Sequence, residues 1–185
     1  LISITGDTTK TFTGNLTPNG GIVHSGAGNL AIAAGNATAT LTIPAGTTYD
    51  LQSDASIVPG GGGLRRSIMN LGTFRKSAGS GVSTISVGFD NPGAAIDVQA
   101  GTLRLTASDN VHSGATISAS AGATLEFTGF NTLTGNFTGT GGGSVVLSGS
   151  GNLTIGTGGA TFNFSDNLFQ WTGGTINAQT NGLAN

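Results

Sequence analysis

Cysteine is absent from the 185-residue chain, which excludes both disulfides and thiolate metal sites. Charged residues make up only 8 per cent, against about 25 per cent in an ordinary soluble domain. With four prolines, and with glycines that do not recur at every third position, the chain cannot form a collagen triple helix. No apolar run approaches the roughly 18 residues of a membrane span, and the first residues, LISITGDTT, do not resemble a signal peptide.

The charge balance gives little reason to expect nucleic acid as a partner, since six basic residues face eight acidic ones and the net charge is −2. An apolar content of 36 per cent at so low a net charge also argues against disorder. The length predicts one domain over residues 1–185.

Pairs of apolar residues separated by one small polar residue recur along the chain. Such pairs show the two-residue period of a β-strand and are too short for a helix. Glycine, at 34 residues, and many β-branched residues disfavour helix throughout. The pairs include Leu30/Ile32, Leu41/Ile43, Tyr49/Leu51, Ile85/Val87, Ile96/Val98, Leu103/Leu105, Leu125/Phe127, Val145/Leu147, Leu153/Ile155 and Phe162/Phe164.

The spacing of these strands predicts a parallel β-helix with coils of about 20–22 residues. Ile96 and Ile117 are 21 residues apart, and Leu103 and Leu125 are 22 apart. The phrase SGAGNLAI, which begins at residue 25, returns 123 residues later as SGSGNLTI, an interval of about six coils. The alternative is an antiparallel β-sandwich, because turn signals every 8–12 residues are also typical of that fold.

In a β-helix the apolar pairs would point inward and their polar neighbours outward. Glycines in QAG, SAG, PAG and GTGG fall where sharp corners are needed. A Gly/Arg-rich segment at about 59–67 is expected to be irregular. The phenylalanines are expected mainly in the interior. Trp171 shares one strand face with Phe169, where it can close the end of the stack or present a ring to a sugar.

Two long phrases, NLGTFRKSAGSGVSTISVGFDNPGAAIDVQAGTLRL and SASAGATLEFTGFNTLTGNFTGTGGGSVVLSGSGNLTI, resemble the repeats of bacterial secreted and cell-surface β-helix proteins. These are the filamentous-haemagglutinin and autotransporter-passenger class, and the likeness extends from about residue 26 to 176. The resemblance implies an extracellular or cell-surface location. It does not specify an activity, because the class includes adhesins, matrix components and enzymes.

Four of the six basic residues form the sequence cluster Arg65, Arg66, Arg75 and Lys76. Such a cluster can bind an acidic polysaccharide, a phosphate-rich surface or an acidic patch on another subunit, and it can equally be a solvated loop. With Trp171, these residues are the candidate ligand-binding set. The segment has too few basic and aromatic residues for a nucleic-acid site.

An acid–base site is a further hypothesis. Asp97 and Glu126 each lie between two apolar residues, so both are expected to face outward one coil apart, near Arg104. The alternative is a solvated charge cluster. His24 and His112 lack any metal-binding motif, and the calcium nonapeptide repeat is absent, so no metal, cofactor or catalytic residue is predicted.

Neither LISIT nor TINAQTNGLAN contains a helix or a charged strand that would cover an open solenoid end. Either flanking coils of a longer chain or identical subunits stacked head to tail would then continue the ladder. The first hypothesis is therefore a non-catalytic extracellular structural protein that forms a filament, sheath or adhesive stalk. The alternatives are a carbohydrate-binding adhesin module and a polysaccharide-active enzyme.

Overall fold

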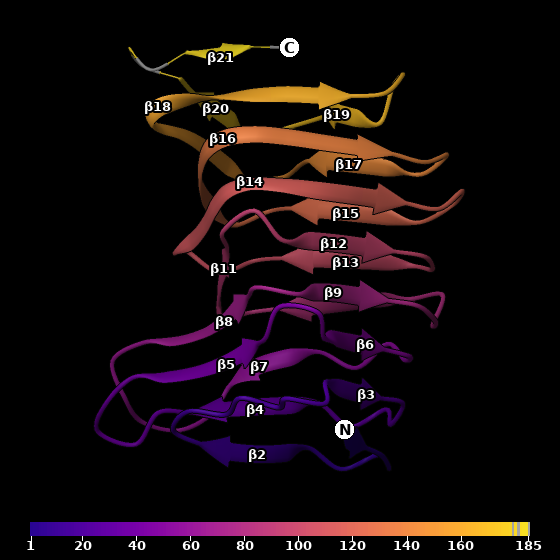
Figure 1. The fold of residues 1–185 in the computed structure, drawn as a ribbon, viewed down its shortest axis with the longest axis vertical. Coiled ribbons are helices and arrows are strands. Elements are labelled where there is room, and N and C mark those ends of the chain that lie inside the picture. Colours follow the sequence, from indigo (N-terminus) through magenta and orange to yellow (C-terminus); the bar gives the residue numbers. More distant parts are fainter. Residues whose placement is uncertain (179, 181, 185) are drawn as a thin grey trace.

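The computed structural model describes residues 1–178, 180 and 182–184. Every strand pairing among them is parallel, and the strands stack coil upon coil along one axis (Figure 1). The predicted parallel β-helix is confirmed. The antiparallel sandwich is wrong, because each strand pairs with the equivalent strand one coil away and not with its neighbour in sequence.

Each coil has three sides, which we call the first, second and third faces in chain order. The second face is an eight-stranded sheet with one strand from each coil, so the described chain makes eight coils. Its strands are β2 (Lys10–Thr13), β4 (Leu30–Ala33), β7 (Ile57–Pro59), β10 (Val82–Ile85), β13 (Thr102–Leu105), β15 (Thr124–Phe127), β17 (Ser144–Leu147) and β19 (Phe169–Trp171).

The first and third faces form one thirteen-stranded sheet that bends around a corner. The first face contains β1 (Ile2–Ile4), β3 (Ile22–His24), β6 (Thr48–Leu51), β9 (Thr73–Lys76), β12 (Ala95–Val98) and β21 (Leu183–Ala184). The third face contains β5 (Ala39–Ile43), β8 (Arg66–Asn70), β11 (Gly88–Asn91) and β20 (Thr175–Asn177). Three long strands run from the third face into the first: β14 (Asn110–Ala119), β16 (Phe130–Thr140) and β18 (Asn152–Phe164).

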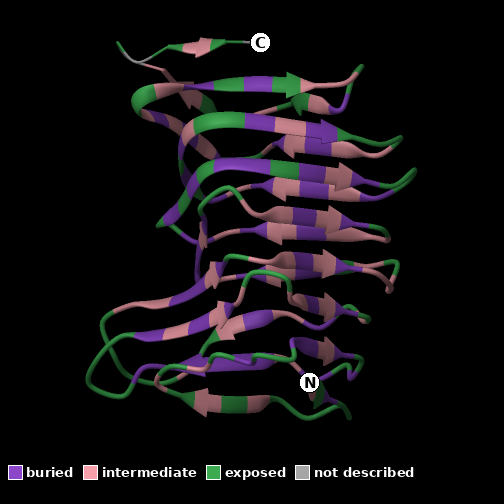
Figure 2. Cartoon of the chain, in the orientation of Figure 1, coloured by how far each residue is buried: buried purple, intermediate pink, exposed green. Residues whose placement is uncertain are grey.

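The core is a set of columns that run along the axis. Figure 2 shows buried and more exposed residues alternating along most strands, as a two-residue period requires. In one column Leu103 pairs with Leu125, and Leu125 with Val145, all three fully buried. Of the ten predicted inward pairs, only Phe164 is not buried, and it still packs against the core.

Coil length varies more than predicted. Ile96 pairs with Ile117, a coil of 21 residues, but Ile22 pairs with Tyr49, a coil of 27. The additional residues lie in corners, and Figure 1 shows that the loops leading into β5 and β8 extend further sideways than those of later coils. The segment predicted to be irregular over 59–67 is a loop of residues 60–65 between β7 and β8.

Corners need glycine where coils approach closely. Gly101, in the QAG phrase, has a φ of 58°, in the left-handed region that disfavours other residues. A Cβ at this position would also collide with the backbone oxygen of Gly81 in the coil below. The backbone angle and the coil spacing therefore both require glycine there.

Buried asparagines complete the corner between the third and first faces, a feature that the sequence analysis did not predict. The Asn70 amide donates to Asn91 Oδ1 at 2.6 Å and to the Ala95 carbonyl at 2.9 Å. Asn91 in turn donates to the Ala94 carbonyl at 3.0 Å. These amides satisfy corner carbonyls that would otherwise be buried without a donor.

Across the part of the chain that the structure describes, no helix has the length and apolar character needed to cross a bilayer.

Candidate functional site

The four basic residues that cluster in sequence do not form one surface patch. Lys76 occupies an inward position of β9, in register with Leu51 and Val98, and is completely buried. Its amine donates to the backbone oxygens of Ser53 and Ala78 at 2.8 and 2.9 Å and to Asp54 Oδ1 at 2.9 Å. The expectation that Lys76 contributes to an exposed basic loop is wrong, because the two-residue period of β9 turns its side chain into the coil.

Arg75 points outward from the same strand and binds Asp97 on the next coil, with 3.0 Å between Nε and Oδ2. Burial by itself would raise the pKa of Asp97. The hydrogen bonds from Ser118, Gln99 and Arg75 outweigh burial and hold that pKa below its usual value. Arg75 is therefore a link between coils.

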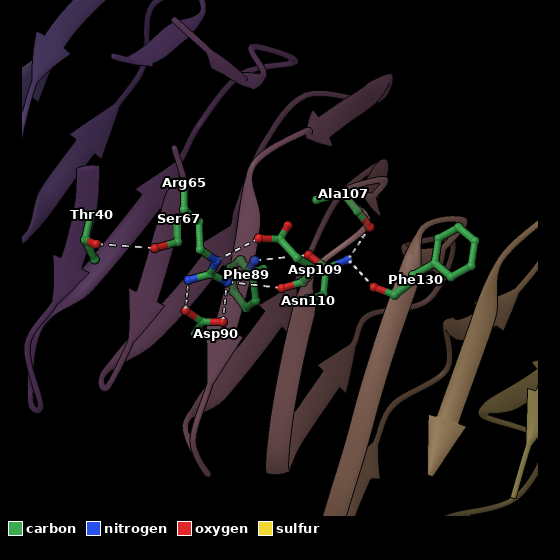
Figure 3. A network of polar contacts seen from close by, with 9 residues as sticks. All are labelled: Thr40, Arg65, Ser67, Phe89, Asp90, Ala107, Asp109, Asn110 and Phe130. Carbon is green, nitrogen blue, oxygen red and sulfur yellow. Dashed lines mark hydrogen bonds and ion pairs between the residues drawn. The ribbon is translucent and has the colours of Figure 1, made fainter. Parts of the chain in front are cut away.

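Arg65 joins three coils at the edge of the third face (Figure 3). Its guanidinium binds Asp90 through both terminal nitrogens, at 2.7 and 2.9 Å, and Asp109 through Nε at 2.7 Å. A fourth bond, of 3.1 Å, reaches the backbone oxygen of Asp109. The Asp90 hydrogen bond is the largest cause of a raised pKa for Arg65. Through this bidentate arrangement the charge of Arg65 is already paired within the protein.

Arg66 differs from the other arginines. It begins β8, pairs in register with the buried Ala39, and forms no ion pair among the described residues. Its Nε is buried without a hydrogen-bond acceptor. The side chain lines a hollow of about 300 Å³ at the corner beneath the 60–65 loop, together with Leu64, Ser86 and Asp109.

Asp97 and Glu126 do not lie together, so the predicted acid–base arrangement is wrong. Asp97 lies on β12 in the thirteen-stranded sheet, whereas Glu126 lies on β15 in the eight-stranded sheet. Both side chains face outward as predicted, but from different faces of the coil. Glu126 binds Arg104 on the coil below at 2.6 Å, and that contact was predicted correctly.

The pKa of Glu126 lies below its usual value. Burial opposes this shift, but hydrogen bonds from Ser148 and Arg104 outweigh burial. Asp97 has the same direction of shift for the same reason. Neither carboxyl is held in the protonated form that a general acid needs near neutral pH.

A longer groove of about 680 Å³ follows the outside of the third face. Phe130 and Val111 stand in it, 57 and 43 per cent exposed, beside Asp90 and Asp109. The expectation of an interior ring is wrong for Phe130. The inward positions of β16 are Asn131 and Leu133, so the two-residue period places Phe130 outside.

Both histidines are buried in the solenoid interior. His24 donates from Nε2 to the Gly28 carbonyl at 2.9 Å, which leaves Nδ1 to accept from the Tyr49 hydroxyl at 2.8 Å. Burial is the main cause of a lowered pKa in both, to about 4 in His112. The described residues contain no group of three metal-ligating side chains.

Trp171 lies at the last strand of the second face. It is in register with the buried Leu147, so it continues an interior column, yet it is 58 per cent exposed. Its indole nitrogen donates to the Gly174 carbonyl at 3.2 Å. Phe169 shares its strand face and packs against the core, as predicted.

No protein-family model matches the chain, and neither a curated protein nor a solved structure matches it. The resemblance to bacterial surface β-helix proteins therefore stays a prediction. The functional argument rests on the geometry of the solenoid itself.

Proposed function

We propose that this protein is a non-catalytic, extracellular structural protein whose coils continue from one molecule into the next, building a filament, sheath or adhesive stalk. The observation that carries this proposal is the uncovered column at Trp171. An interior position with more than half of a tryptophan exposed indicates that another rung belongs above it.

Both ends of the described stack leave inward-facing apolar side chains only partly buried. At one end Ile2 and Phe12 lie at inward positions of β1 and β2 and are only partly buried. At the other end Phe169 and Ile176 lie at inward positions of β19 and β20 and are also only partly buried. Among the described residues, β2 and β19 are the edge strands of the eight-stranded sheet, and each has one side unpaired. Placing the first coil of one copy on the last coil of another would extend every column, and such a contact repeats without closing.

The charged side chains support a structural role, because they join one coil to the next. All five ion pairs given by the structure join different coils, as in Arg75–Asp97 and Arg104–Glu126. A single exposed pair contributes little, but these pairs accompany continuous backbone ladders and hold each coil in register with the next. The resulting body is a rod suited to extension along its axis.

Electron microscopy and sedimentation velocity over a hundredfold concentration range test the proposal. We expect rods that lengthen with concentration. Trp171→Glu should shorten them, because it places a charge at the proposed contact. Val82→Glu is the matched control: it adds the same charge at a 42 per cent exposed site on β10, in the middle of the rod. Monodisperse single molecules at every concentration would refute stacking between copies.

The extracellular location is tested separately. Antibody raised against the purified chain should label intact, unpermeabilised cells. Labelling only after permeabilisation would contradict this part of the proposal.

A further inference from the structure

Arg66 is a charge that the fold does not use. The side chains of Arg65, Arg75, Lys76 and Arg104 each bind a carboxylate on another coil. For Arg66 the structure gives neither an ion pair nor a side-chain hydrogen bond, and its Nε is shielded from water. A buried donor without an acceptor is costly, and it is more costly when it carries charge. The side chain of Arg66 also lines the hollow, so a ligand with an anionic group there can pair with its charge.

The surroundings of Arg66 define the chemistry of that ligand. Asp109 lines the same hollow with its side chain 44 per cent exposed, although it is paired with Arg65. A doubly charged phosphate would lie close to this carboxylate and be repelled. A carboxylate with one charge can bind Arg66, while hydroxyl groups on the same molecule donate to Asp109 and bond to Ser86 and Ser108.

The hollow continues into the groove on the third face, because Arg65, Ser108 and Asp109 line both. Figure 3 shows Phe130 beyond Asp109 and Asn110, with its ring turned away from the polar network. An exposed aromatic ring can pack against the apolar face of a sugar when neighbouring side chains accept hydrogen bonds from the sugar hydroxyls. Arg66 and Phe130 lie three coils apart, about 14 Å at roughly 4.8 Å per coil, so one ligand that touches both must be an oligomer.

We propose that the third face binds an oligosaccharide with one uronate residue along the solenoid axis. Arg66 holds a uronate carboxylate, Asp109 accepts sugar hydroxyls, and Phe130 packs against a further ring. The proposal assigns a ligand to a surface on the side of the rod, so it does not depend on stacking at the ends.

Isothermal titration calorimetry with a trisaccharide of two galactose units and one galacturonate tests the assignment, with its methyl-esterified form as the neutral comparison. We expect the acidic trimer to bind at least tenfold more tightly than the ester. Arg66→Gln should weaken trimer binding at least tenfold, since a hydrogen-bonded charge pair is lost. The control Lys10→Gln also removes one positive charge, but on β2, away from the groove, and should change affinity less than twofold. Phe130→Ala should weaken binding of the trimer and leave that of monomeric galacturonate unchanged.

Leu64→Glu provides a second test that does not depend on how the chain tolerates a change at Arg66. Leu64 is 83 per cent exposed and lines the hollow. The new carboxylate can therefore form an ion pair with Arg66 and should abolish trimer binding. No trimer binding by the unaltered chain, or equal affinity in Arg66→Gln, would overturn the proposal. Inorganic phosphate that binds through Arg66 in the absence of trimer binding would overturn the saccharide assignment.

Discussion

We predict that acid destabilises the protein, because His112 is buried in the core in its neutral form. His112 is fully buried between Phe89 and Phe127, with ring centres 6.0 and 5.7 Å away. Its pKa falls from the ordinary 6.5 to about 4 because burial disfavours the charged ring. The unfolded chain therefore binds a proton at a higher pH than the folded chain does. The stability associated with neutral His112 is complete above about pH 6.5 and is lost as pH falls toward 4.

The size of the effect follows from the two pKa values. At about 1.36 kcal/mol per pKa unit the full loss approaches roughly 3.4 kcal/mol below pH 4, and it is about 2 kcal/mol at pH 5. The substitution that isolates this effect is His112→Leu, because Leu133 occupies the same column one coil away. At pH 7 the variant loses a long hydrogen bond, 3.4 Å, to Asn131 and the ring contacts with Phe89 and Phe127.

Urea unfolding followed by circular dichroism at pH 7, 6 and 5 measures both chains. The unaltered protein should lose about 2 kcal/mol more than His112→Leu between pH 7 and 5. His24 titrates in both chains, so its contribution cancels in the comparison. Equal pH dependence in the two proteins would refute the reasoning that His112 is held neutral by burial.

Three further changes test separate parts of the structure by urea unfolding at pH 7. Gly101→Ala should destabilise the fold by more than Gly149→Ala, because both glycines have a φ of 58° but only Gly101 meets a neighbouring coil; equal losses would contradict the role of close approach. Lys76→Ala should cost about 3 kcal/mol, since it leaves three acceptors without their buried amine, and a loss under about 1 kcal/mol would show that the anchor is dispensable. Arg65→Gln should cost roughly 2 kcal/mol, a value reduced for partial exposure, and an unchanged urea midpoint would show that the clasp on Asp90 and Asp109 contributes nothing to stability.

The fold could be predicted from sequence because its signal is local and repeated. Each apolar pair, such as Leu103/Leu105, encodes a strand and its inward side at once, and recurrence at one coil length excludes a hairpin. The period alone, however, does not specify the face. The phrases SGAGNLAI and SGSGNLTI look like one repeat, yet Leu30 lies on β4 of the second face and Leu153 on the third-face part of β18. They share a sequence pattern but neither a coil position nor a turn conformation, since Gly149 has a φ of 58° and Gly26 does not lie in the left-handed region.

The candidate site was harder to predict, because side-chain partners depend on corner lengths that vary. Asp97 and Glu126 have identical local patterns but lie on different sheets, since the face is set by counting through two corners. Alternate side chains of β9 point inward. Lys76 lies two residues after the buried Phe74, so the alternation would have shown that Lys76 also points inward. For Arg66 no such signal exists. Arg66 has no ion pair because Asp90 and Asp109 both bind Arg65 instead. The spacing of residues in the sequence does not reveal that three-dimensional arrangement.

The uneven corners have an evolutionary consequence. Coils of 21 and 27 residues preserve the same parallel ladder, so length changes are absorbed outside the strands. Insertions at the 60–65 loop would therefore reshape the rim around Arg66 without disturbing the columns beneath it. Related chains can therefore differ in the ligand that the surface around Arg66 binds, while the stacked coils stay the same.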